Sequence, residues 1–100
     1  MEKYAVAPAA EVLPGRARVI VAGGIEIGLF SVAGSYRAYR NLCPHAGAPV
    51  CRGEVTGEIV RCPWHAWEFD LVSGQAVGNP ACRLESFPVE VIDGTLVVSI

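Results

Sequence analysis

The sequence has little positive charge, no long uninterrupted apolar run and only two histidines. Lys and Arg total 8 of the 100 residues against 10 Asp and Glu, which gives a formal net charge of -2. This balance argues against a basic nucleic-acid-binding surface. The apolar region at residues 19–32 is interrupted by Gly23, Gly24 and Glu26 and is too short to span a bilayer. We therefore expect neither a nucleic acid nor a membrane among the partners.

The first residues also lack a secretory signal, because residues 1–6 contain no basic segment followed by a long apolar run. A cytoplasmic location follows, and disulfides rarely persist in that reducing compartment. We expect Cys51 and Cys82 to be thiols. A chain of 100 residues that is 52% hydrophobic can form a core without disulfide staples. The expected organisation is therefore one domain that covers residues 1–100.

Helical periodicity is weak along the whole chain, whereas short β-branched and aromatic runs recur between Gly, Pro and Asn. This pattern predicts an all-β fold. Gly23-Gly24 and Asp93-Gly94 are two-residue hairpin signals. Residues 8–15 are expected to form a loop with one helical turn, and turns are expected at residues 53–58 and 78–81. The expected strands cover residues 4–6, 16–22, 25–32, 36–42, 59–61, 67–70, 84–92 and 95–100, and Ser73-Gly74 is expected to turn the chain back from residues 67–70 into residues 75–77.

The remaining feature is a pair of short Cys/His motifs. Cys43-Pro44-His45 is followed by sixteen residues and then by Cys62-Pro63-Trp64-His65, and these are the only histidines in the chain. A structural zinc site usually draws like ligands from each motif, as in Cys-x2-4-Cys followed by His-x3-5-His. Here each motif is mixed. If the two loops face each other, both cysteines meet on one side and both histidines on the other.

That arrangement suits a [2Fe-2S] cluster in which Cys43 and Cys62 hold one iron while His45 and His65 hold the other. Two alternatives stay open from the residues alone. The four side chains could hold zinc and stabilise an interaction module. They could also be core residues without a metal, since cysteine is often buried as a small hydrophobe.

At these positions the sequence resembles the Rieske iron-sulfur proteins, whose signature is Cys-x-His, a spacer of similar length, and Cys-x2-His. All four ligand positions match. The resemblance extends to flanking residues: Arg40-Asn41-Leu42, Gly47-Ala48-Pro49, Arg52-Gly53, the run from Cys62 to Asp70, and Ser73-Gly74.

The resemblance implies a Rieske-like antiparallel β-sandwich or barrel base into which a cluster-binding subdomain of two loops, at about residues 41–81, is inserted. We expect two stacked hairpins, each presenting one ligand loop. The resemblance also implies one [2Fe-2S] cluster. It further implies that the protein carries single electrons from a flavin-dependent reductase to a terminal oxygenase of the ring-hydroxylating type. Such a protein is a component of an oxidoreductase system rather than a catalyst by itself. A small subunit of a nitrite-reductase-like enzyme is the alternative.

The same resemblance predicts a low reduction potential. High-potential Rieske proteins carry an extra disulfide, whose positions match Ala48 and Trp64 here. They also aim a serine and a tyrosine hydroxyl at the cluster sulfurs, where this chain has Trp67 and Phe69. Without these features, the potential is expected near about -150 mV, the low end of the Rieske range.

Overall fold

The computed structural model describes residues 2–44, 47–64 and 67–100. These residues form three antiparallel sheets, which confirms the all-β prediction. No helix in the described part of the chain is long and apolar enough to cross a membrane. The strands are β1 (Lys3–Pro8), β2 (Arg18–Ala22), β3 (Ile25–Val32), β4 (Ser35–Arg40), β5 (Glu54–Thr56), β6 (Ile59–Arg61), β7 (Glu68–Asp70), β8 (Gln75–Ala76), β9 (Asn79–Arg83), β10 (Ser86–Phe87), β11 (Val89–Ile92) and β12 (Thr95–Ser99), and the 3-10 turns are η1 (Ala9–Glu11) and η2 (Val50–Arg52).

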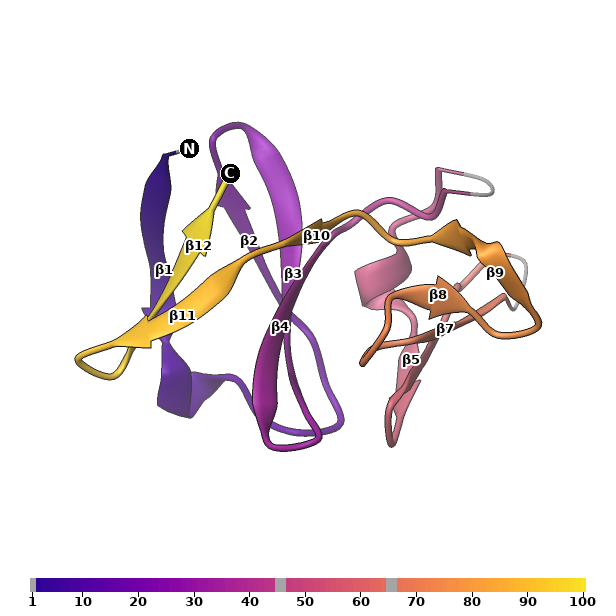
Figure 1. Cartoon of the computed structure of the whole chain (residues 1–100), viewed down its shortest axis with the longest axis horizontal. Helices are drawn as coiled ribbons and strands as arrows, with labels where there is room; N and C mark the ends of the chain where they lie inside the picture. Colours follow the sequence, from indigo (N-terminus) through magenta and orange to yellow (C-terminus); the bar gives the residue numbers. More distant parts are fainter. Residues whose placement is uncertain (1, 45–46, 65–66) are drawn as a thin grey trace.

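Two of the sheets form a base that carries both chain termini (Figure 1). One has the strand order β1-β12-β11 and the other β10-β4-β3-β2. The predicted hairpin turns are confirmed, since Ala22 pairs with Ile25 across Gly23-Gly24, and Ile92 pairs with Thr95 across Asp93-Gly94. The helical turn predicted before β2 is η1.

Strand β3 is buried on both faces, which explains its apolar sequence. Ile27 and Leu29 belong to the core between the two base sheets, whereas Phe30 and Val32 belong to a second core on the opposite face. This division follows the two-residue period of a strand. The second core also contains residues of the third sheet, so the base sheet supports that sheet through β3.

The third sheet has the order β5-β6-β7-β8-β9 and is inserted in the sequence between β4 and β10. Figure 1 shows it at the end of the molecule away from the chain termini. The predicted β-base with an inserted two-loop unit is therefore the observed architecture. Both predicted ligand loops border this sheet, one before β5 and the other between β6 and β7.

Four local predictions were wrong. Residues 54–56 form strand β5 rather than part of a turn, and residues 79–83 form strand β9, which as an edge strand tolerates Pro80. The single strand predicted at residues 84–92 is interrupted at Pro88, which lacks an N–H for the ladder. Finally, only the second ligand loop lies in a hairpin, because β4 pairs with β3 and β10 and not with β5.

Candidate metal centre

Cys43 lies in the first ligand loop, which leaves β4 at Arg40 and ends at η2. The Cys43 side chain is almost completely buried, with 1% exposure. Its backbone N–H donates to the Ala48 carbonyl over 2.8 Å, and its carbonyl accepts from the Gly47 N–H over 2.7 Å. These two bonds hold the Cys43 backbone against Gly47 and Ala48.

Cys62 begins the second ligand loop, at the tip of the β6-β7 hairpin. Arg61 pairs with Glu68 at the end of the ladder, and the Cys62 N–H donates to the Trp67 carbonyl over 2.6 Å. Cys62 is also 1% exposed. The hairpin therefore fixes the second cysteine by regular strand pairing.

The structure places Cys43 and Cys62 in the same buried apolar cluster, together with Phe69 and Leu71. Neither cysteine forms a disulfide. A thiolate is the form that binds a metal, and burying its charge is costly unless a cation offsets it. Iron would supply that positive charge. Two buried cysteines from separate loops therefore fit the sulfur side of the predicted mixed-ligand cluster.

The other two predicted ligands, His45 and His65, lie outside the described residues. Within the described ranges, no three Cys, His, Asp or Glu side chains form a group that could hold a metal ion. Assignment of all four ligands is therefore a proposal.

Gly53 brings the two ligand loops together. It directly follows η2, and a Cβ at Gly53 would lie 1.8 Å from the backbone carbonyl oxygen of Arg61, the residue before Cys62. Only a glycine permits this approach without movement of the backbone. The sequence showed Gly53 as part of the family resemblance, but its close contact with Arg61 depends on the tertiary fold.

Tyr39 supports the third sheet from the base. Its hydroxyl donates to the Leu71 carbonyl over 2.6 Å, and its ring centroid lies 6.1 Å from that of Phe30. Burial of the side chain raises the pKa of Tyr39 above its usual value. Sequence reasoning did not identify this support, because Tyr39 and Leu71 are 32 residues apart.

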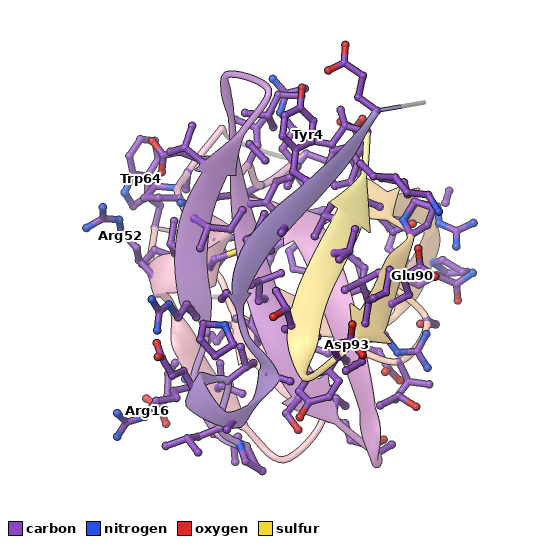
Figure 2. All side chains as sticks on the ribbon, turned by 90° about the vertical axis from the view of Figure 1, so that its left-hand side faces the viewer. Tyr4, Arg16, Arg52, Trp64, Glu90 and Asp93 are labelled. Atoms are coloured by element: carbon purple, nitrogen blue, oxygen red, sulfur yellow. The ribbon has the colours of Figure 1, made fainter. Side chains whose placement is uncertain are left out.

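Apolar side chains are exposed beside both cysteines. Leu42 directly precedes Cys43 and is 42% exposed, and Trp64 follows Cys62 by two residues and is 62% exposed. Figure 2 shows the Trp64 and Arg52 side chains on the same side of the molecule, both pointing away from the ribbon. The loops thus combine buried cysteines with an outward-facing indole.

Comparisons with known proteins agree with this geometry. The Rieske [2Fe-2S] domain model matches residues 2–88. The ferredoxin component of the naphthalene 1,2-dioxygenase system of Pseudomonas putida is 30% identical over 82 residues, which cover 81% of this chain and 79% of the relative.

Solved structures show the same similarity. The Sphingomonas yanoikuyae B1 ferredoxin has a TM-score of 0.87 and 26% identity and covers 99% of both chains. A chain from the complex of reduced oxygenase and oxidized ferredoxin in carbazole 1,9a-dioxygenase has a TM-score of 0.84 and 26% identity, with 96% of this chain and 100% of that chain covered. A putative NADH-dependent nitrite reductase small subunit from Mycobacterium tuberculosis has a TM-score of 0.83 and 25% identity, with 97% of this chain and 93% of that chain covered.

The matched family model covers most of the chain, including the segment that holds both buried cysteines. The donor atoms of these cysteines are the sulfur ligands that the family's cofactor requires. The chain therefore belongs to the Rieske [2Fe-2S] domain family, and its cofactor is one [2Fe-2S] cluster.

Proposed function

We propose that this chain is a single-electron carrier, a Rieske-type ferredoxin that transforms no substrate by itself. The observation that carries the proposal is the burial of Cys43 and Cys62 in one apolar cluster, on two loops that each contain a histidine. When bound, the [2Fe-2S] cluster supplies one-electron redox chemistry.

Cys43 and Cys62 would hold one iron, and His45 and His65 the other. The two cysteines bind as anionic thiolates, so they stabilise the oxidised state of their iron. The two histidines bind as neutral imidazoles, which leave their iron easier to reduce. Burial of both cysteines excludes water from the sulfur side. The exposed side chains of Leu42 and Trp64 would form part of the surface that redox partners contact.

The proposed electron donor is a flavin-dependent reductase, and the proposed acceptor is a terminal oxygenase of the ring-hydroxylating type. Two similarities support the acceptor. The Pseudomonas putida relative is named as the ferredoxin component of a dioxygenase system, and one structural neighbour is a ferredoxin in complex with an oxygenase. We place the protein in the cytoplasm, where Cys51 and Cys82 would stay reduced.

The experiment is metal analysis and spectroscopy of the purified protein and of two variants. The natural protein is expected to be red-brown, to contain iron and sulfide, and to give a reduced-state EPR signal with a low average g. Cys43→Ser is expected to lose the colour because it removes a sulfur ligand. Cys82→Ser is the matched control, since Cys82 is half-buried and lies outside both motifs, and it should keep the colour. Zinc in place of iron, or a coloured Cys43→Ser variant, would refute the proposal.

A second candidate function is that of a small subunit in a nitrite-reductase-like enzyme. The similarity to the Mycobacterium tuberculosis protein favours this candidate. The two functions differ in their partner, so affinity purification from the source organism distinguishes them. A tightly bound sirohaem protein would support the subunit, whereas a carrier should be recovered without one.

A further inference from the structure

The two ligand loops are closed at their bases in different ways. The second loop is closed by regular strand pairing, with Arg61 opposite Glu68 and the Cys62 N–H bonded to the Trp67 carbonyl. The first loop has no such ladder, because it enters from β4 and leaves through η2, and β4 pairs with β3 and β10. Backbone bonds of Cys43 with Gly47 and Ala48 close the inner part of this loop, and its outer ends, Asn41 and Cys51, are joined through a side chain.

Asn41 makes that connection. Its side-chain Oδ1 accepts from the backbone N–H of Cys51 over 2.8 Å, which joins the entry of the loop to its exit. Its side-chain Nδ2 donates to Glu26 Oε1 over 3.1 Å, and its backbone N–H donates to the Glu26 carbonyl over 2.9 Å. One amide group therefore links the loop entry, the loop exit and strand β3.

Burial makes the bond between Asn41 and Cys51 important, whereas Glu26 at the other end of the link is exposed. Asn41 is 9% exposed and Cys51 is 4% exposed, so neither partner can readily exchange its bond for water. The side-chain amide serves both partners at once, since Nδ2 donates to a carboxylate while Oδ1 accepts from a backbone N–H. Aspartate at this position would keep the acceptor, lose the donor and face the Glu26 carboxylate.

Asn41 is close in the chain to the first ligand loop and is connected in space to the second through Cys51 and Gly53. It lies two residues before Cys43, and its partner Cys51 lies two residues before Gly53, which packs against the Arg61 carbonyl beside Cys62. A shift of Cys51 would therefore move the first loop relative to the second.

We propose that Asn41 is the positioning residue of the first ligand loop: by joining Glu26 to Cys51 it sets the position of Cys43 relative to Cys62. This inference rests on the proposed role of Cys43 as a ligand. Groups that orient metal ligands typically change metal affinity roughly ten- to hundredfold when they are replaced. A comparable effect is expected for the rate at which the cluster is lost.

The test exchanges the amide and the carboxylate. In Asn41→Asp, two carboxylates face each other, and the visible absorbance should bleach in the presence of an iron chelator roughly ten- to hundredfold faster than in the natural protein. Adding Glu26→Gln again sets an amide opposite a carboxylate, now with the amide at position 26 and the carboxylate at position 41. The cluster of the double variant should therefore recover most of the lifetime that it has in the natural protein. Asn79→Asp, at an exposed position in β9, introduces the same charge and should leave the lifetime unchanged.

A second measurement does not depend on cluster lifetime. In Asn41→Leu, hydrogen–deuterium exchange should accelerate in the peptide that contains the Cys51 amide. The peptide that contains the Cys62 amide serves as the internal control, because that amide is bonded to Trp67 rather than to Asn41. Unchanged exchange at Cys51 would overturn the proposal.

The remaining outcomes are also decisive. The positioning role would be refuted if Asn41→Asp bleached at the same rate as the natural protein. It would also be refuted if Glu26→Gln failed to restore the lifetime of the cluster. If Asn41→Asp does not fold, recovery of folding by Glu26→Gln supports the proposal and its absence refutes it. Failure of the proposed function is recognised separately, by zinc in place of iron or by a coloured Cys43→Ser variant, and neither result would affect the exchange result at Cys51.

Discussion

The Cys51 sulfur occupies the space that a side chain at Gly28 would need. A Cβ at Gly28 would lie 2.3 Å from Cys51 Sγ and 2.7 Å from Cys51 Cβ. Gly28 is in β3 of the base, and Cys51 is in η2 at the end of the first ligand loop. The end of the first ligand loop therefore packs directly against the base sheet at Gly28.

Gly28→Ala should therefore destabilise the protein. Overpacking in a core typically costs about 1–3 kcal/mol, because side chains and backbone must shift. Urea denaturation measures the loss. Adding Cys51→Ala should recover part of it, since the nearest atom is then removed while the Cβ contact is kept. A Gly28→Ala variant as stable as the natural protein would contradict the observed contact.

Gly53→Ala should affect the cluster more strongly than Gly28→Ala does. The new Cβ would meet a backbone carbonyl at 1.8 Å, which cannot rotate away as a side chain can, so β5 and β6 would separate next to Cys62. We expect a strong loss of iron in the purified variant. Gly57→Ala is the control: it has open space around its Cβ but a φ of 60°, so it should cost only about 1–2 kcal/mol of strain and keep its iron. Equal iron content in both variants would argue against the Gly53 contact.

Cys51 should resist alkylation while the protein is folded. Burial raises the pKa of the Cys51 thiol to about 12 from an ordinary value of 9.0, so near neutral pH its thiolate fraction is about a thousandfold smaller than usual. Cys82 is only partly buried and should react with iodoacetamide first, as measured by peptide mass spectrometry. Faster labelling of Cys51 than of Cys82 would contradict this assignment.

The same shift predicts a pH dependence of stability. Because the folded-state pKa of Cys51 lies above the ordinary value, the neutral thiol contributes stability that is fully present below about pH 9. That contribution should be lost as the pH rises from about 9 toward 12. Denaturation of the natural protein and of Cys51→Ala at several alkaline pH values measures it, and the difference between them should shrink with rising pH.

The reduction potential should lie near about -150 mV, at the low end of the Rieske range. The family resemblance places Ala48 and Trp64 where high-potential Rieske proteins carry a disulfide, and the fully buried Phe69 has no hydroxyl to donate to a cluster sulfur. Fewer hydrogen bonds to sulfur stabilise the reduced state less. A redox titration followed by visible absorbance gives the midpoint, and a value well above zero would reject this prediction.

The residue pattern alone predicted most of the base. The two-residue period of β3 and the Gly23-Gly24 and Asp93-Gly94 turns are local signals, because a hairpin is specified by neighbouring residues. The pattern did not predict β5 and β9, whose few residues become strands only by pairing with β6 and β8. Short strands carry too little periodicity to be recognised before their partners are known.

The sequence by itself determined the candidate ligands, because two mixed Cys/His motifs restrict the chemistry of a site whatever the fold around them. Only the tertiary structure decided how the first loop is closed. Asn41, Glu26 and Cys51 are separated by 10 and 15 residues, so no local pattern joins them. They meet because β3 and β4 pair in one register and because Gly28 leaves room for the Cys51 sulfur.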